Sequence, residues 1–372
     1  MPLSASLEQR LLPGVLSVPS DELLRWLHAR NEPPYRVKQI RRWILLRRAS
    51  SFEQMTDLPV RLRAELAAHF RVLGTELREV ANTTDGTSKL LVGLVDGRAV
   101  ECVLMRTEDR RTVCVSTQVG CAMGCVFCAS GLEGVERNLE PYEILEQFLH
   151  ATRLLGPQER LTHAVIMGMG EPLANLNNLL AALEVVCSRD GLGLSRRRVT
   201  ISTVGLPAAI RRLADLGVQY HLAISLHAPT DTLRNQIVPV NRKVGVEELV
   251  AAGDYYFEKT GRQVTYEYVL LKGINDTIDC ARRLAELLRG RSVHINLIPY
   301  NPVESLNFET PSPHRVRQFT DYLRSRGFVV HVRRTKGREI SAACGQLRLR
   351  HKRGQAAASP HNATAQSASP GN

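Results

Sequence analysis

The sequence contains no run of about 18 or more consecutive apolar residues, which is the length that a membrane-spanning helix needs. We therefore expect no membrane span. Its first 19 residues include the acidic Glu8 and lack an apolar stretch behind a basic start, so they do not resemble a secretory signal. A cytoplasmic protein is the expectation, and in that reducing compartment eight cysteines indicate metal binding or chemistry rather than disulfides.

The chain also has fewer acidic than basic residues. The chain has 37 Asp and Glu against 49 Lys and Arg, which gives a formal net charge of +12. Such an excess favours a polyanionic partner, because Lys and Arg bind phosphates with release of counterions. Nucleic acid is the first candidate, and a basic protein without such a partner is the alternative. The length of 372 residues allows about two domains.

Lys, Arg, Asp and Glu are absent altogether from residues 354–372, which are rich in Ala, Ser, Pro and Asn. A segment of this composition cannot bury enough apolar surface to fold. We therefore interpret residues 351–372 as a disordered tail.

Residues 1–74 are predicted to form a small helical accessory domain. Ser20 is suited to cap a first helix, because two acidic residues that favour a helix N-terminus follow it. Apolar residues at helical spacing predict a second helix around residues 37–44, and residues 58–70 complete the module.

Basic residues are concentrated in this helical module. Between Arg25 and Arg48 it has eight Arg or Lys and one acid, Glu32. This density favours RNA binding through phosphates, although a charge run is often only a solvated helix face. Three aromatic residues could stack on bases, but their helical spacing is more typical of a core: Trp26, Tyr35 and Trp43.

Residues 75–111 are predicted to be a β-hairpin linker. The runs 90–95 and 99–105 flank Asp96-Gly97, a pair that permits the positive φ angles of tight hairpins. Glu101 lies in the second strand, where a lone Glu is usually solvent-facing. Cys102 alternates with Glu101 and is expected on the opposite face.

From residue 112 onward, β-type runs alternate with helical patterns. The six predicted strands are residues 112–116, 162–167, 198–202, 221–226, 264–270 and 292–298. The helices between them are residues 142–154, 176–187, 207–216, 246–259 and 276–288, and a helix at 313–325 and a strand at 328–333 follow. This alternation indicates a parallel sheet of the α/β class, with active-site residues at the strand C-termini. Six units predict a partial (β/α)6 barrel within residues 112–350.

Three cysteines with CxxxCxxC spacing follow the first of these strands: Cys121, Cys125 and Cys128. A 4Fe-4S cluster needs one ligand per iron, so three thiolates leave one iron open to another ligand. The alternatives are a structural zinc knuckle or three buried thiols. Structural zinc normally takes four protein ligands, and no His lies nearby in the sequence, so we favour the cluster.

This spacing resembles that of the radical SAM enzymes. The resemblance implies that the open iron chelates S-adenosylmethionine (SAM) and that an electron from the cluster releases a 5'-deoxyadenosyl radical. It also matches the predicted partial barrel, in which GMGEP at residues 168–172 follows the second strand as similar motifs do in that superfamily.

Five motifs narrow the resemblance to one family. In chain order they are VCVSTQVGCAMGCVFC, VIMGMGEPL, ISLHAP, NLIPYNP and SAACGQL. Together they resemble the radical SAM adenine-C2 RNA methyltransferases of the RlmN type, which act on 23S rRNA and on tRNA at the adenine next to the anticodon. YRVKQIRRW and FEQMTDLP are similar to that family's N-terminal RNA-binding domain. Residues 338–340 depart from the family, since acidic residues are more typical there.

The resemblance implies a set of site residues. The ligands of one 4Fe-4S cluster would be Cys121, Cys125 and Cys128. The contacts to SAM would be Gly170, Glu171, Ser202, Ser225, Leu226, His227 and Asn301. From its position alone, His227 could equally be an imidazole of the core.

Three further residues have implied roles in the reaction. Cys344 matches the cysteine that is methylated, Cys114 its resolving partner, and Glu101 the proton acceptor. Two SAM molecules are then used per turnover, one as methyl donor and one as radical source. Release of the product leaves a Cys114–Cys344 disulfide that an external electron donor must reduce. Without the resemblance, Cys344 would be interpreted as an ordinary loop or core cysteine.

Two other functions stay open. The first is methylation at C8 rather than C2 of adenine, and the second is a noncatalytic, metal-containing RNA-binding protein. Cys187 and Cys280 lie in apolar helical patterns and are expected to be packing residues. We expect a monomer.

Overall fold

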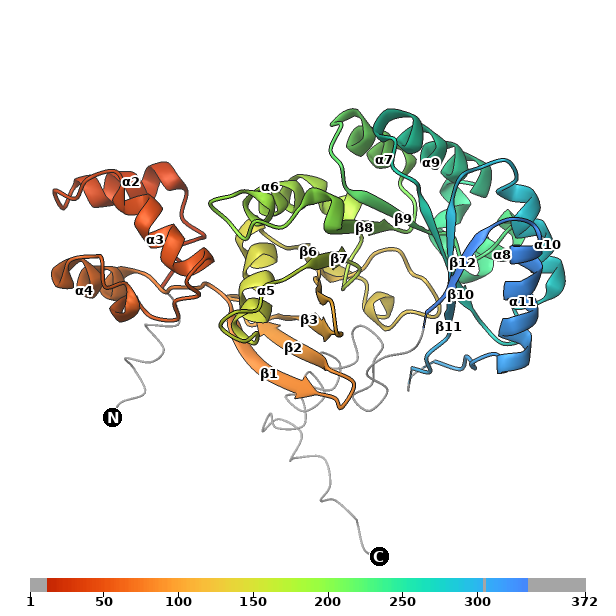
Figure 1. Cartoon of the computed structure of the whole chain (residues 1–372), viewed down its shortest axis with the longest axis horizontal. Helices are drawn as coiled ribbons and strands as arrows, with labels where there is room; N and C mark the ends of the chain where they lie inside the picture. Colours follow the sequence, from red (N-terminus) through yellow and green to blue (C-terminus); the bar gives the residue numbers. More distant parts are fainter. Residues whose placement is uncertain (1–11, 304–305, 334–372) are drawn as a thin grey trace, which may run out of the picture.

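The computed structural model describes residues 12–303 and 306–333. The molecule is elongated, with a helical module at one end and a curved sheet covered by helices at the other (Figure 1). The expectations for Cys344, for the SAACGQL motif and for the tail 351–372 lie outside the described residues. None of the helices in the described ranges has the length and apolar character to span a membrane.

The helical module contains α2 (Ser20–His28), α3 (Arg36–Leu45), η1 (Phe52–Gln54) and α4 (Val60–His69). Its core includes Leu27, Ile44 and Leu66, all fully buried. The capping prediction for Ser20 is wrong: Pro19 occupies the N-cap position, and no side chain caps the helix. Trp26 and Trp43 are half-buried against the core, as their spacing predicts, but the same prediction is wrong for Tyr35, which is exposed.

Polar contacts join this module to the rest of the chain. The guanidinium of Arg48 donates to the carbonyl oxygens of Leu155 and Gly156 at 3.2 and 3.1 Å. The carboxylate of Glu146 accepts from the backbone N–H groups of Gly74 at 2.9 Å and Thr75 at 2.7 Å. The module is therefore held to the larger domain at two places.

Three antiparallel strands follow the module: β1 (Glu76–Asn82), β2 (Thr87–Gly93) and β3 (Ala99–Arg106). The predicted hairpin is β2–β3, but its first strand begins and ends earlier than expected. The strand ends at Gly93 because the turn begins at the next residue. The Leu94 N–H donates to the Arg98 carbonyl and closes the turn, in which Gly97 has φ +82°. Since β3 pairs with the next strand, the predicted linker extends the main sheet.

Seven parallel strands continue this sheet, and helices between them cover it. The strands are β4 (Arg111–Cys114), β7 (His163–Ile166), β8 (Val199–Thr203), β9 (His221–Ser225), β10 (Thr265–Leu270), β11 (His294–Pro299) and β12 (Val329–Val332). The helices are α5 (Pro141–Arg153), α6 (Leu176–Cys187), α7 (Pro207–Asp215), α9 (Val246–Thr260), α10 (Ile278–Leu287) and α11 (Pro313–Ser325).

This arrangement confirms the predicted α/β class and partial barrel. The sheet has two edges, β1 and β12, so the barrel is open (Figure 1). The short helix α8 (Asp231–Ile237) and the small sheet of β5 (Gln118–Gly120) and β6 (Val135–Asn138) lie outside the predicted elements. Both flank the C-terminal ends of the barrel strands, where ligands of α/β proteins bind.

Candidate active site

A cavity of about 310 Å³ lies at the C-terminal ends of the parallel strands. Its polar and sulfur-bearing lining residues include Cys121, Cys125, Cys128, Glu171, Ser202, Ser225, His227, Glu267, Asn301 and Arg333. Apolar residues such as Val204, Val269 and Ile298 line the rest. Its volume lies at the lower end of the usual range for ligand sites. The structure therefore brings most of the site residues predicted from the sequence to one cavity.

The cysteine loop is held by backbone hydrogen bonds. The Cys121 N–H donates to the Gly134 carbonyl at 2.8 Å, and the Val126 N–H donates to the Ile237 carbonyl at 3.1 Å. Burial raises the pKa of Cys121 to about 11 and raises that of Cys125 still further, with the neighbouring thiols adding to the effect. These thiols are therefore protonated at neutral pH until a metal displaces the protons.

The donor set is suited to a 4Fe-4S cluster. Three half-buried thiols, Cys121, Cys125 and Cys128, belong to the cavity lining. A cluster of this kind takes one ligand per iron, so three thiolates would hold it and leave one iron open to another ligand.

Glu171 connects the loops that follow β7 and β8. Its carboxylate accepts from the N–H groups of Leu173 at 3.0 Å and Val204 at 2.8 Å, while its own N–H donates to Gln118 Oε1 at 2.8 Å. Gly170 before it has φ +100°, and a Cβ there would lie 2.6 Å from the Gln118 Cβ. The glycine is therefore required for this close approach, and Glu171 retains lone pairs for a ligand.

His227 combines the two roles that the sequence left open. Its ring is buried, and Nδ1 accepts from the Val269 N–H at 3.1 Å, so the neutral ring carries its proton on Nε2. Burial lowers the pKa of His227 to about 3, with a further contribution from Arg234. The residue has φ +60° and also lines the cavity. It is thus a packed imidazole that also forms part of the cavity lining.

Leu226 is the one predicted cofactor contact that is not part of the cavity lining. Its side chain is fully buried, and its carbonyl accepts from Arg234 Nε at 2.8 Å. Any contact that it makes to a ligand is therefore through its backbone.

Arg234 is a site residue that the sequence did not reveal. Its guanidinium is fully buried and also donates to the carbonyls of Val204 at 2.5 Å and Ser225 at 3.1 Å, and to Asn241 Oδ1 at 2.7 Å. It fixes the ends of β8 and β9 against each other behind the cavity. A single Arg in a polar helix gives no sequence signal for such burial.

Glu101 and Cys114 lie on neighbouring strands rather than in this cavity's lining. The register pairs Val103 with Cys114, and Glu101 lies two residues before Val103 on the same strand. Glu101 and Cys114 are therefore on one face of the sheet. The alternative interpretation, in which Glu101 is an ordinary solvent-facing residue, does not hold, because its carboxylate is buried and pairs with Lys89. Cys102 lies on the opposite face as predicted, where its thiol contacts the Gln147 carbonyl at 3.7 Å.

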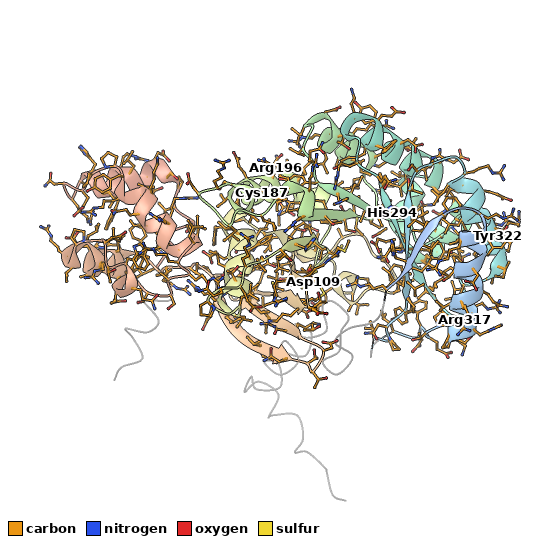
Figure 2. All side chains as sticks on the ribbon, viewed as in Figure 1. Asp109, Cys187, Arg196, His294, Arg317 and Tyr322 are labelled. Atoms are coloured by element: carbon orange, nitrogen blue, oxygen red, sulfur yellow. The ribbon has the colours of Figure 1, made fainter. Side chains whose placement is uncertain are left out.

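The remaining thiols have packing roles, as predicted. Cys280 is buried on α10, and Cys187 is half-buried at the end of α6, next to Arg196 (Figure 2). Burial raises the pKa of Cys187 to about 11, which disfavours the nucleophilic thiolate at neutral pH.

Comparison with known proteins agrees with this geometry. The family model of the radical SAM superfamily matches residues 115–288, and that of the ribosomal RNA large subunit methyltransferase N-terminal domain matches residues 15–72. A Rhodopirellula baltica protein named "Probable dual-specificity RNA methyltransferase RlmN" is 57% identical over 88% of this chain and 88% of its own length. The Anaeromyxobacter dehalogenans protein named "Dual-specificity RNA methyltransferase RlmN" is 45% identical over 90% of this chain and 91% of its own.

A solved structure shares the fold over almost the same length. The crystal structure of a radical SAM methyltransferase from Sphaerobacter thermophilus superposes with a TM-score of 0.85 at 43% identity, covering 90% of this chain and 98% of that one. With these identities over most of its length, the chain belongs to the RlmN family of radical SAM methyltransferases.

Proposed function

We propose that this chain methylates C2 of adenine in 23S rRNA and in tRNA, using one 4Fe-4S cluster and two molecules of SAM per turnover. The observation that supports this most is the single cavity in which the cysteine loop, Glu171, Ser202, Ser225, His227 and Asn301 meet. The relatives named as dual-specificity RNA methyltransferases support RNA as the substrate. The protein acts as a monomer in the cytoplasm, with an external electron donor.

C2 of adenine is an electron-poor carbon without a lone pair, so it cannot attack a sulfonium methyl group directly. When bound, the cluster and SAM supply the radical chemistry that overcomes this. The chain's own contribution begins at Cys344, whose thiolate accepts the methyl group that is passed to the base. Cys121, Cys125 and Cys128 hold the cluster, and Ser202, Ser225, His227 and Asn301 orient SAM beside it.

Two residues complete the cycle. Glu101 takes the proton that C2 loses together with one electron, and the charge of the neighbouring Lys89 keeps its carboxylate in place at the sheet. Cys114, as a thiolate, then attacks the Cys344 sulfur and forms a disulfide. The electron pair of the broken bond between sulfur and carbon stays with the carbon, which takes up a proton to become the methyl group. The external donor supplies two electrons to open that disulfide.

The exposed face of α3 supports RNA docking. Among the eight basic residues of this region, Arg25, Arg30 and Arg36 pair with acids of the module, and Arg48 is bound by carbonyl groups. Lys38, Arg41, Arg42 and Arg47 form no ion pair within the described residues. Lys38 and Arg42 are exposed one helical turn apart, where they can meet successive phosphates.

Nucleoside analysis tests the proposed reaction. Mass spectrometry of 23S rRNA and tRNA from a deletion strain should show loss of 2-methyladenosine in both pools, restored by the wild-type gene. Loss of 8-methyladenosine instead would contradict the position of methylation, and an unchanged tRNA pool would contradict the second substrate.

Two variants test the cysteine roles. Cys344→Ala should abolish methyl transfer while reductive cleavage of SAM continues. Cys114→Ala should accumulate protein covalently joined to RNA, visible as a nuclease-sensitive shift on a denaturing gel. Normal turnover by the Cys114 variant without an adduct would contradict its resolving role.

A further inference from the structure

Glu267 is a buried carboxylate in the active-site cavity to which neither the sequence nor the proposed reaction gives a role. It lies on β10, and the register pairs it with Ser225 of β9 and Asn296 of β11. Its backbone carbonyl accepts from the N–H groups of Leu226 and His227 at 3.0 and 3.2 Å. The backbone of Glu267 is therefore fixed by the loop that carries two of the proposed cofactor contacts.

The side chain of Glu267 is only partly satisfied by the protein. Its Oε2 accepts from Asn296 Nδ2 at 2.8 Å, and within the described ranges the carboxylate makes no second hydrogen bond. The residue is 5% exposed, yet it is part of the cavity lining, so the accessible part of it faces the cavity. A buried carboxylate with an unused oxygen is costly, unless a ligand donates to it.

The groups around Glu267 allow its carboxyl to be either protonated or ionised near neutral pH. Burial raises the pKa of Glu267 to about 7, while Arg333, which also lines the cavity, and the hydrogen bond from Asn296 act in the opposite direction. Near neutral pH, the group can accept a hydrogen bond as a carboxylate or donate one as an acid. This suits a ligand edge on which donors and acceptors lie side by side.

An adenosine moiety has such an edge. Its exocyclic amine and ribose hydroxyls are donors, and N1 is an acceptor next to the amine. Val204, Val269 and Ile298 in the same cavity provide apolar surface for the ring. Both ligands of the proposed function contain adenosine: SAM, and the RNA nucleotide that is methylated.

We propose that Glu267, held by Asn296, is a recognition residue for an adenosine moiety bound in this cavity. The inference rests on the proposed function for the identity of its ligands. The competing role is purely structural, a Glu–Asn pair that joins β10 to β11 and touches no ligand.

The test compares Glu267→Gln with Glu258→Gln, a control at an exposed position on α9. Dissociation constants are measured by fluorescence anisotropy for a stem-loop RNA containing the target adenosine, and for the same RNA with purine riboside, which lacks the amine. Wild type and the control should prefer adenosine, and Glu267→Gln should lose about tenfold of that preference. This ratio requires no methyl transfer, so it is independent of whether the proposed reaction is correct.

A second arm identifies the source of the adenosine. Affinity for SAM is measured by equilibrium dialysis on protein with its cluster reconstituted. A tenfold loss here, with RNA discrimination unchanged, would assign Glu267 to the cofactor. Glu267→Asp, which keeps the charge, serves as a second variant if the Gln variant folds poorly. Changes below about twofold in both arms, for variants that unfold like wild type, would overturn the proposal.

Discussion

The Lys89 ammonium nitrogen lies 3.1 Å from Oε2 of Glu101, and each side chain is only 2% exposed. Lys89 pairs in register with Val103, and Val103 with Cys114, so the ion pair shares one sheet face with the proposed resolving cysteine. Burying two charges is costly, and the pair persists because each compensates the other.

Replacing Lys89 alone should lower the stability of the fold more than replacing both Lys89 and Glu101. Lys89→Met leaves the Glu101 carboxylate buried without this counter-charge, and we expect a loss of about 3 kcal/mol in the free energy of unfolding. Lys89→Met combined with Glu101→Gln should recover most of it. Urea denaturation measures both variants, with Lys272→Met, from an exposed pair with Glu309, as control. Equal losses for the single and double variants would contradict the coupling.

The sequence predicts local patterns better than this kind of pairing. The strands β7 to β11 are short runs of β-type residues that alternate along the chain with helical patterns, so they and their helices could be predicted. The Asp96-Gly97 turn likewise predicted β2–β3, and counting back from it would have placed Lys89 on the face of Glu101. Counting back from the turn does not by itself establish this pairing, because the pairing also depends on where the two strands begin and end. Tertiary hydrogen bonds determine those positions.

The same contrast holds for the site residues: those set by local sequence could be predicted, and those set by tertiary contacts could not. The cysteine spacing is local, and the loops at strand ends converge because parallel strands end at one edge. Arg234 could not be predicted, since its partners are backbone carbonyls after β8 and at the end of β9 and the side-chain oxygen of Asn241. Glu267 stands in a predicted strand, but its cavity-facing carboxylate depends on which face of the sheet curls inward.

Acid should weaken the junction between the helical module and the barrel at His150. Its Nε2 lies 2.9 Å from Thr75 Oγ1, and burial, together with Arg153 and Arg71, lowers the pKa of His150 to about 4. In the unfolded chain His150 binds a proton near pH 6.5, whereas in the folded chain it does so only near pH 4. The contribution of His150 to stability is therefore fully present above pH 6.5 and is lost as the pH falls toward 4. The loss approaches about 3 kcal/mol.

Comparison with His150→Gln isolates this contribution. Glu146, whose pKa burial raises to about 7, has the opposite pH dependence but is common to both proteins. Urea denaturation between pH 8 and 5 should show a smaller loss for His150→Gln than for wild type, whereas His28→Gln, at an exposed position, should follow wild type. Parallel curves for all three would contradict the assignment.

Removing one cluster ligand should remove the metal but leave the fold. Cys125→Ser, purified without oxygen, is expected to lose most iron, sulfide and visible absorption, because two thiolates cannot hold the cluster firmly. Cys187→Ser should retain all three, since that thiol lies at the end of α6. Iron and sulfide assays with circular dichroism decide this. A colourless wild type containing zinc would contradict the cluster and favour a noncatalytic metal protein.

Charge reversal on α3 should weaken RNA binding in a salt-dependent way. Lys38 and Arg42 are exposed, whereas Arg41 is half-buried and its pKa is lowered by burial, so the first two are the better test. Each phosphate contact contributes about 0.7 to 0.9 to the slope of log affinity against log salt. Lys38→Glu with Arg42→Glu should therefore reduce that slope by about 1.5. The control is Arg315→Glu with Arg317→Glu on α11, at the opposite end of the molecule (Figure 2). If the slope and affinity changed equally in both double variants, the basic charge would act through the overall field of the protein rather than through contacts on α3.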